Sequence, residues 1–306
     1  MNQYLFQPIS KKICAGVEIS VFEIGGENID QVTVDSFGEE WSKFHSFTES
    51  EIQHAGDQYF DLVTSQMLNR DSLVLDMGCG TGRWTKYVAE KAGFVEAIDP
   101  SKAVLSAAYL LKDQPNIRIT QTSVSNIPFQ DESFDFVFSL GVLHHIPDTR
   151  KAMQETVRKL KKGGYFLVYL YYNLDNRGSF FKGLFYLSNL LRKTVSGMPA
   201  KRKKAVCELL VILLYLPFVY TARFFRLIGL KKIAAGIPLS YYADKSLHII
   251  RNDCLDRFGT PLEQRFSKME IAEMMETCGL AEIRFSEKEP FWHAIGRKVR
   301  SSEAQD

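Results

Sequence analysis

A short run of glycines directly after an apolar segment is the feature of this sequence with the clearest chemical meaning. Leu73-Val-Leu is followed by Asp76, and three glycines then alternate at Gly78, Gly80 and Gly82. The residues that follow have a helical pattern, so the glycines fall in a strand-to-helix turn. Glycine lets the backbone approach a bound ligand closely. The pattern therefore predicts a turn that holds a nucleotide-containing ligand.

The acidic residues around this turn indicate the charge of the ligand. The dinucleotide fingerprint G-x-G-x-x-G would need its third glycine where Arg83 stands. A carboxylate at Asp76 would oppose a pyrophosphate and favour a ligand that carries ammonium and sulfonium charges. The next predicted strand, 94–98, ends in Asp99, whose carboxylate can accept hydrogen bonds from both hydroxyls of a ribose. We therefore expect a positively charged nucleoside ligand.

Six segments, in this order, carry a family resemblance: 74–82, 97–101, 127–129, 133–138, 142–148 and 160–164. Together they resemble the class I S-adenosylmethionine-dependent methyltransferases, in particular the type 11 domains that are similar to ubiquinone/menaquinone methyltransferases. The resemblance implies S-adenosylmethionine as cofactor and S-adenosylhomocysteine as product. The cofactor-binding residues it implies, together with those expected from the turn, are Asp76, Gly78, Cys79, Gly80, Gly82, Asp99, Pro100, Ser123, Val124, Ser139 and Gly141.

One position departs from the family pattern. The family usually has an acid near the end of the third strand, where it receives the adenine amino group, and Ser123 stands there. A hydroxyl accepts that hydrogen bond without charge assistance, so the bond is weaker. The alternative is that the backbone amide of Val124 and apolar walls hold the adenine.

Two histidines are the candidates for proton transfer. Methyl transfer is an in-line displacement that needs alignment and exclusion of water, but a nucleophilic oxygen or nitrogen must also lose a proton. His144 and His145 follow the strand expected at 134–140, and we predict that one of them is a general base. A scaffolding or cofactor-side role for the pair is the alternative.

Tyrosines are the candidates for contact with the methyl acceptor. Alternation along the fifth strand places Tyr169 and Tyr171 on one face and Tyr172 on the other. We predict that these residues, with Tyr241 and Tyr242 further along the chain, line the acceptor pocket. Packing beneath a neighbouring segment is the alternative role.

The elements that must position these residues alternate along the chain, which predicts an α/β fold with a doubly wound, Rossmann-like sheet. Strands are expected near 72–77, 94–99, 116–121, 134–140, 164–171, 281–286 and 291–296, and helices near 83–92, 101–112, 148–161 and 268–278. The resemblance implies seven strands, with the last inserted antiparallel. Ahead of them we expect a hairpin, 13–24 with 29–34, turning at 25–28, and then helices at 37–47 and 51–68.

Four regions follow from this pattern. Residues 1–70 are expected to cover the cofactor site, 71–172 to bind the cofactor, 173–265 to form a helical insert after strand five, and 266–306 to add the final helix and two strands. Within 174–236, twelve basic residues stand against two acidic ones, a net charge of +10 in a chain of net charge +2. The remainder of the chain therefore carries −8, and the contrast suggests an anionic partner.

The insert also contains an apolar run at 209–218, bounded or broken by Glu208, Pro217 and Arg223. The run by itself is too short to span a bilayer. It is expected to form a helical cap packed on the core. The alternative is a lid that accepts a lipophilic substrate or makes peripheral contact with a membrane surface.

Composition suits a soluble globular protein. It has 306 residues, 45% of them hydrophobic, and five scattered cysteines without metal-ligand spacing. We therefore expect reduced thiols, no metal site and a cytoplasmic location, since the N-terminus also lacks the pattern of a signal peptide.

The function expected from these features is transfer of a methyl group to oxygen or carbon of a small acceptor. The acceptor would be lipophilic or carrier-linked and anionic, as in surface-glycan, quinone or secondary-metabolite pathways. Two alternatives are a nucleic-acid methyltransferase that grips phosphates with the basic insert, and a cofactor-binding partner subunit without activity. Nucleic acid is disfavoured as a partner because no target-base motif or RNA-binding module is present and the insert is strongly apolar. The sequence leaves the identity of the acceptor and the oligomeric state undetermined.

Overall fold

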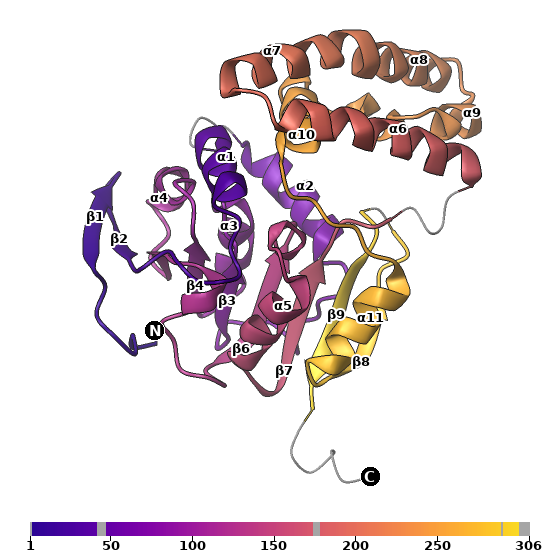
Figure 1. The fold of residues 1–306 in the computed structure, drawn as a ribbon. Coiled ribbons are helices and arrows are strands. Elements are labelled where there is room, and N and C mark those ends of the chain that lie inside the picture. Colours follow the sequence, from indigo (N-terminus) through magenta and orange to yellow (C-terminus); the bar gives the residue numbers. More distant parts are fainter. Residues whose placement is uncertain (1, 42–46, 174–177, 289, 300–306) are drawn as a thin grey trace. The chain divides into compact units, whose positions relative to one another are not determined.

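The computed structural model describes residues 2–41, 47–173, 178–288 and 290–299 (Figure 1). The contacts within the chain separate two units, 1–175 with 262–306 and 176–261. The second unit lies within the segment 173–265 that the sequence marks as an insert.

The first unit is built on one mixed sheet whose strands follow the order β1-β2-β5-β4-β3-β6-β7-β9-β8. These strands are β1 (Ser10–Cys14), β2 (Val17–Val21), β3 (Leu73–Met77), β4 (Phe94–Asp99), β5 (Ile117–Gln121), β6 (Phe134–Leu140), β7 (Leu160–Tyr169), β8 (Leu280–Phe285) and β9 (His293–Lys298). The five strands from β3 to β7 pair in parallel, and β9 is antiparallel to both β7 and β8. The predicted α/β sheet with an antiparallel last strand is confirmed, but it has nine strands instead of seven because the N-terminal hairpin extends it beside β5.

Helices cover both faces of this sheet (Figure 1). They are α1 (Gln31–Trp41), α2 (Glu49–Tyr59), α3 (Arg83–Ala89), α4 (Val104–Leu111), α5 (Thr149–Arg158) and α11 (Lys268–Thr277), with 3₁₀ turns η1 (Val124–Asn126) and η2 (Leu143–His145). Apolar residues of α2, α3 and α4 pack on one face of the sheet, and those of α5 and α11 pack on the other. Since both faces are buried, the ends of the strands are the surfaces left for a site.

The N-terminal hairpin lies elsewhere than the sequence predicted. Its turn is Ala15-Gly16, both with positive φ (50° and 82°), which suits a two-residue hairpin loop. Residues 29–34, expected to be its second strand, instead lead into α1, because the Asp30 carboxylate accepts a hydrogen bond from Thr33 N at 2.7 Å and caps the helix. The Gly25-Gly26 segment therefore joins β2 to α1.

Helix α1 lies at the carboxyl ends of the parallel strands, here called the carboxyl edge of the sheet. The ring of Phe37 is 4.9 Å from the ring of His145, and Thr33 Oγ1 accepts a hydrogen bond from Leu262 N. The segment ahead of α1 is fixed by Asn28, whose amide donates to Asp148 O at 2.8 Å and accepts from Asp148 N at 2.7 Å. This buried side chain thus connects the N-terminal region to the loop that follows the two histidines.

Replacing Asn28 with alanine is expected to loosen α1 over the carboxyl edge. The change removes two hydrogen bonds at a buried position and should lower the free energy of unfolding by about 1–3 kcal/mol. Chemical denaturation measures the loss. Gln53→Ala, which removes an exposed side-chain contact in α2, is the control and should change stability by less than about 0.5 kcal/mol. Equal effects of the two changes would contradict this role of Asn28.

The second unit is helical. Its elements are α6 (Ser179–Ser196), α7 (Ala200–Leu210), η3 (Val211–Tyr215), α8 (Leu216–Leu227), α9 (Lys231–Gly236), η4 (Ser240–Asp244) and α10 (Leu247–Gly259). Its core gathers residues of α7, η3, α8 and α10, among them Val211, Tyr215 and Phe258.

The expectation that Pro217 ends the apolar segment is wrong. Helices α7 and α8 are continuous through η3, which is a π-helical turn: the N–H of Leu216 bonds the carbonyl of Val211, five residues back. A π turn widens the helix just before the proline, so the helix accommodates the ring without a break. Within the described residues, 201–227 is thus one helix long and apolar enough to cross a membrane by length and composition, with a mean hydropathy of 2.0 in an 18-residue window of it.

Candidate functional site

Asp76 lies at the carboxyl end of β3 and is only 1% exposed. Its Oδ2 accepts a hydrogen bond from the hydroxyl of Thr85 in α3 at 2.6 Å. Burial is the main reason that the pKa of Asp76 rises from 3.8 to about 8; the Thr85 bond lowers it, and the nearby charge of Asp99 raises it further. One hydrogen bond does not offset the loss of hydration of this buried carboxylate, so a nearby cation would stabilise its charged form.

The glycine turn after Asp76 has the backbone shape that only glycine adopts easily. Gly78, Gly80 and Gly82 all have positive φ, at 85°, 52° and 81°. A Cβ on Gly78 would lie 2.4 Å from a methyl carbon of Val142, whereas a Cβ on Gly80 would meet no atom within 4 Å. Gly78 therefore permits close packing inside the protein, and Gly80 leaves its side of the turn open to a ligand.

Asp99, at the end of β4, stabilises the same turn. Its Oδ2 accepts from the backbone N–H of Gly80 at 2.9 Å, and its Oδ1 accepts from the N–H and hydroxyl of Ser101 at 2.8 and 2.6 Å. Burial raises the pKa of Asp99, while these hydrogen bonds lower it. The structure thus brings Asp76, Asp99 and the glycines together at one edge, with Asp99 holding the turn in shape.

The other predicted cofactor residues lie along this edge, with part of their polar groups already used by the protein. The hydroxyl of Ser123 donates to Gly25 O at 3.2 Å, and that of Ser139 donates to Met77 O at 2.8 Å. Cys79 and Val124 are buried in apolar clusters. The carbonyl of Pro100 accepts a hydrogen bond from the side chain of Gln121. Gly141 has a φ of 77° and donates its N–H to Tyr169 O. The Cys79 side chain is thus used in packing within the protein, and its contact with a cofactor stays a prediction.

His144 and His145 stand in η2, just beyond β6, and differ in their surroundings. His144 is fully buried, and within the described part of the chain neither of its ring nitrogens has a hydrogen-bond partner. Burial, helped by His145 and Arg265, holds the pKa of His144 well below its usual range, so its ring is neutral. His145 Nδ1 lies 2.7 Å from Leu262 O, and because a carbonyl only accepts, Nδ1 carries the proton and Nε2 is the basic nitrogen.

Aromatic residues at the end of β7 and just after it lie near these histidines. Tyr169 and Tyr171 are 5.8 Å apart on one side of the strand, as alternation predicts, and the ring of Tyr171 is 3.9 Å from that of His144. Tyr172 is on the opposite side, where it packs 5.8 Å from Phe291. The structure therefore places Tyr169 and Tyr171 beside the candidate site and separates Tyr172 from it.

Residues 75–168, which contain most of this edge, match the family model described as a methyltransferase domain. This part of the chain is therefore similar to methyltransferase domains. The match confirms the resemblance drawn from the sequence segments.

Curated relatives agree with this identification. The ubiquinone/menaquinone biosynthesis C-methyltransferase UbiE of Campylobacter jejuni is 31% identical over 153 residues, which are 47% of this chain and 63% of that enzyme. The ubiquinone biosynthesis O-methyltransferase of Alkalilimnicola ehrlichii is 34% identical over 125 residues, 39% of this chain and 50% of that enzyme. The chain thus spans between half and two thirds of the length of these relatives. Among solved structures, the YcgJ protein of Bacillus subtilis has a TM-score of 0.46 and 18% identity, with 76% of this chain and 71% of that chain covered.

A segment of the first unit that follows the second unit, 262–266, completes the surroundings of the histidines and was missed by the sequence analysis. Gln264 donates its N–H to His144 O at 3.0 Å and its side-chain amide to Ile146 O at 2.7 Å. The guanidinium carbon of Arg265 lies 5.1 Å from the centre of the Tyr171 ring. No local pattern marks these residues, because they reach the site only after the whole second unit. Thr85 was also missed, although a threonine in the first turn of the helix that follows the glycines is a usable signal.

Tyr241 and Tyr242 belong to the second unit. Tyr242 packs 5.6 Å from Tyr215 within the core of that unit, and burial raises its pKa well above the usual range. Tyr241 is 42% exposed and contacts Tyr242 at 5.2 Å. For Tyr242 a structural role is sufficient, and contact of either residue with an acceptor stays a prediction.

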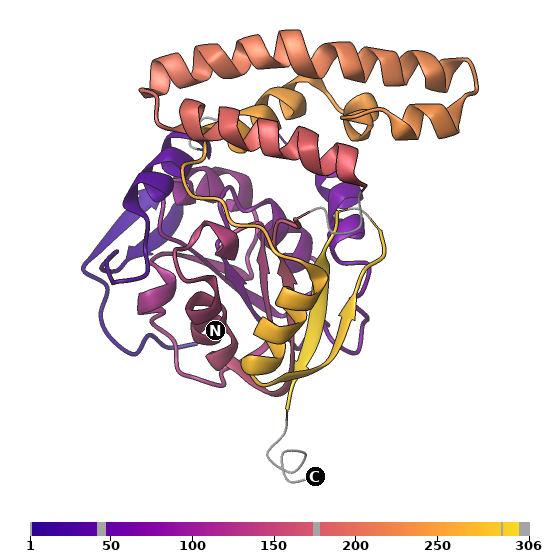
Figure 2. The same ribbon diagram turned by 45° about the vertical axis from the view of Figure 1, so that its right-hand side comes forward.

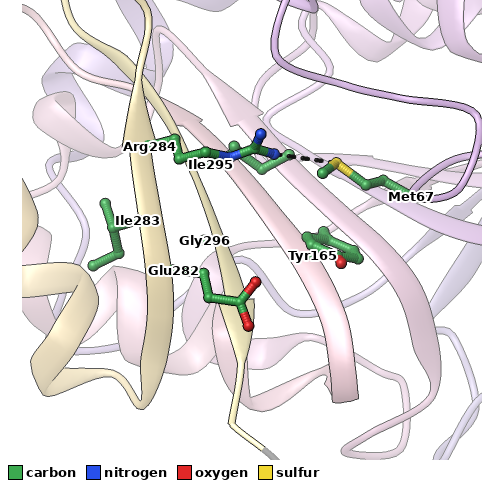
Figure 3. A pocket seen from close by; sticks show the side chains of 7 residues that line it. All are labelled: Met67, Tyr165, Glu282, Ile283, Arg284, Ile295 and Gly296. Atoms are coloured by element: carbon green, nitrogen blue, oxygen red, sulfur yellow. Dashed lines mark hydrogen bonds between the residues drawn. The ribbon is translucent and has the colours of Figure 1, made fainter.

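A separate pocket of about 440 Å³ lies on the first unit away from this edge (Figure 3). It is lined by Met67, Tyr165, Glu282, Ile283, Arg284, Ile295 and Gly296. Tyr165 of β7 pairs with Arg297 of β9. Tyr169, four residues nearer the carboxyl end of β7, pairs with His293. The pocket therefore opens along β7, β8 and β9 and is distinct from the candidate site.

Proposed function

We propose that the protein is an S-adenosylmethionine-dependent methyltransferase that acts on a small lipophilic acceptor. The observation that carries the proposal is the buried Asp76 carboxylate beside the open glycine turn. Its raised pKa shows that the folded protein stabilises the charged form poorly, and a ligand with ammonium and sulfonium groups supplies the missing positive charge. A dinucleotide, with its anionic pyrophosphate, fits this environment badly.

The residues at the turn fit that cofactor. Asp76 would face its positive charges, the backbone at Gly80 would allow close approach, and Asp99 would hold the turn while its remaining lone pairs accept from the ribose hydroxyls. For the adenine, Ser123 already donates its proton to Gly25 O, which leaves its oxygen as an acceptor. S-adenosylmethionine, when bound, supplies an electrophilic methyl group.

The chain itself would orient the acceptor, exclude water and take up a proton. Helix α1 covers the carboxyl edge, and Tyr169 and Tyr171 offer an aromatic wall. We propose His145 as the general base for a hydroxyl acceptor, because the bond from Nδ1–H to Leu262 O leaves Nε2 as the nitrogen that accepts a proton. His144 is the weaker base of the two, since its burial disfavours the charged ring.

Replacing His145 with asparagine tests that assignment. The asparagine amide can still donate to Leu262 O, so the structural bond is kept while the basic Nε2 is lost. We expect kcat to fall by 10²–10⁴-fold with the affinity for S-adenosylmethionine unchanged. Single-turnover assays and calorimetry measure the two quantities.

A structural role for His145 predicts a different result. In that case His145→Asn would keep most of the activity, and His145→Ala, which removes the bond to Leu262, would lower the melting temperature and the activity together. Retained turnover in His145→Asn would therefore refute its role as the base.

The acceptor we propose is a hydroquinone or related aromatic lipid, methylated on oxygen or carbon. The relatives named above act in quinone biosynthesis by their names, and the aromatic wall at Tyr169 and Tyr171 suits a planar apolar ring. We further propose a cytoplasmic protein with peripheral contact to membranes, where such acceptors reside.

The experiment for the whole proposal is incubation of the purified protein with methyl-labelled S-adenosylmethionine and a prenylated hydroquinone. Formation of labelled lipid and S-adenosylhomocysteine supports the proposal. Tight binding of S-adenosylmethionine without transfer to any of a panel of quinols, catechols and carrier-linked sugars would overturn the acceptor class. Failure to bind the cofactor at all would overturn the enzyme assignment.

A further inference from the structure

The long helix 201–227 of the second unit has two apolar faces, only one of which is used inside the protein. Residues Cys207, Val211, Tyr215 and Val219 are buried and belong to the same cluster as Ile250, Cys254 and Phe258 of α10. The opposite face carries side chains that are 53–86% exposed: Leu209, Ile212, Leu213, Tyr220, Phe224 and Leu227. An exposed apolar stripe of this length is unusual on a soluble protein and indicates a binding surface.

The charges near this stripe are positive and uncompensated. Lys201 and Arg202 precede Leu209 by two helical turns, which places them in line with the stripe, and Lys231 and Lys232 follow its other end. In the described part of the chain these four exposed side chains make no hydrogen bond or ion pair. The acidic residue of the helix, Glu208, is paired with Arg251 at 2.7 Å. The stripe therefore presents free positive charge at both ends.

The residues packed against the buried face of helix 201–227 determine whether this helix can cross a bilayer or must lie on its surface. It packs against α10, which carries Arg251, Asp253, Asp256 and Arg257. If the helix crossed a bilayer, its partner helix would bring these charges into the hydrocarbon, at a cost of several kcal/mol each. A helix that lies in the plane of the interface keeps α10 on the water side and immerses only the exposed stripe.

We propose that the stripe of helix 201–227, which is one long helix in Figure 2, docks the second unit on an anionic phospholipid bilayer. The helix would lie in the interface, with its basic ends over lipid headgroups. The apolar side chains supply burial, and the four cations supply attraction to the negative surface. A second copy of the chain is a poorer occupant because the same positive charges would repel each other across a symmetric interface. A nucleic acid is poorer because its phosphates would leave the apolar stripe in water.

Vesicle co-sedimentation of the full chain tests this proposal. The protein should bind vesicles of phosphatidylcholine with 30% phosphatidylglycerol, bind pure phosphatidylcholine much less, and be released by 0.5 M salt. Leu213→Ser with Phe224→Ser should weaken binding at least about tenfold, since both lost side chains lie on the exposed face of the helix. Lys201→Gln with Arg202→Gln should weaken it about 25-fold, from about 1 kcal/mol per cation at the surface.

Matched controls lie on the first unit. Met269→Ser with Tyr109→Ser removes two exposed apolar side chains, and Lys102→Gln with Lys112→Gln removes two exposed cations. Both control variants should bind vesicles as the unaltered protein does. Circular dichroism verifies that every variant keeps the helical content of the unaltered protein.

Three outcomes would overturn the proposal. The first is that the unaltered protein fails to sediment with anionic vesicles, or that the Leu213/Phe224 variant sediments equally well. The second is a stable dimer by light scattering that the same two substitutions dissociate, which would assign the stripe to a second copy. The third is displacement of the protein from vesicles by equimolar RNA, which would assign the cations to nucleic acid.

Discussion

Asp76→Asn is expected to abolish binding of S-adenosylmethionine and, at the same time, to stabilise the ligand-free protein at alkaline pH. The asparagine Oδ1 still accepts the hydrogen bond that Thr85 donates at 2.6 Å, so local structure is kept. The neutral amide has no charge to attract the ammonium and sulfonium groups. We expect the Kd measured by calorimetry to rise about 100-fold or more.

The gain in stability depends on pH in a way that follows from the pKa of Asp76. Burial raises this pKa from 3.8 to about 8, so the folded protein retains a proton that the unfolded chain loses. Stability from this group is therefore fully present below about pH 4 and declines as the pH rises to about 8. The asparagine variant lacks the titration. Its melting temperature should exceed that of the unaltered protein by a few degrees at pH 8.5, and the two should converge at about pH 4.

The control for this experiment is Asp71→Asn, an equal change at an exposed position just before β3. It should alter neither the Kd nor the pH dependence of melting. If Asp76→Asn bound S-adenosylmethionine with unchanged affinity, Asp76 would not face the positive charges of the cofactor. A melting curve of the variant that follows the unaltered protein at every pH would refute the raised pKa.

Alanine substitutions at Gly78 and Gly80 are expected to separate folding from ligand binding. Gly78→Ala combines a positive φ with a Cβ 2.4 Å from Val142, and it should destabilise the protein by about 3–5 kcal/mol. Gly80→Ala meets no protein atom and should cost about 1–2 kcal/mol for its backbone conformation alone. Because its methyl group occupies the open side of the turn, we expect it to weaken cofactor binding by at least about tenfold.

Thermal unfolding and calorimetry on both variants check this pair. Adding Val142→Ala to Gly78→Ala removes the two nearest methyl carbons and should restore part of the lost stability. If Gly80→Ala bound the cofactor normally, the turn would approach its ligand at another residue. If Gly78→Ala were as stable as Gly80→Ala, the packing against Val142 would not be the reason for a glycine there.

Much of the candidate site could be read from local sequence patterns. The order of apolar segments predicted β3 to β9 within a few residues, apart from β7, which begins earlier, at Leu160. The glycine turn and the acids at 76 and 99 follow from the same patterns, since parallel strands end at one edge of a sheet. The charge contrast and apolar run of the second unit also depend only on residue types.

The tertiary structure decided what these groups do to one another. The pKa of Asp76 depends on its burial and on Thr85, nine residues away, and the protonated nitrogen of His145 depends on Leu262, which lies 117 residues further along the chain. The nine-stranded sheet, the helix that continues through Pro217 and the exposed stripe at 209–227 likewise arise from contacts beyond any sequence window. The alternation of apolar residues and the positions of glycines reflect the local geometry of strands and turns, so they can be read from the sequence. The burial of a charged group and its hydrogen-bond partners depend on which distant segments fold together.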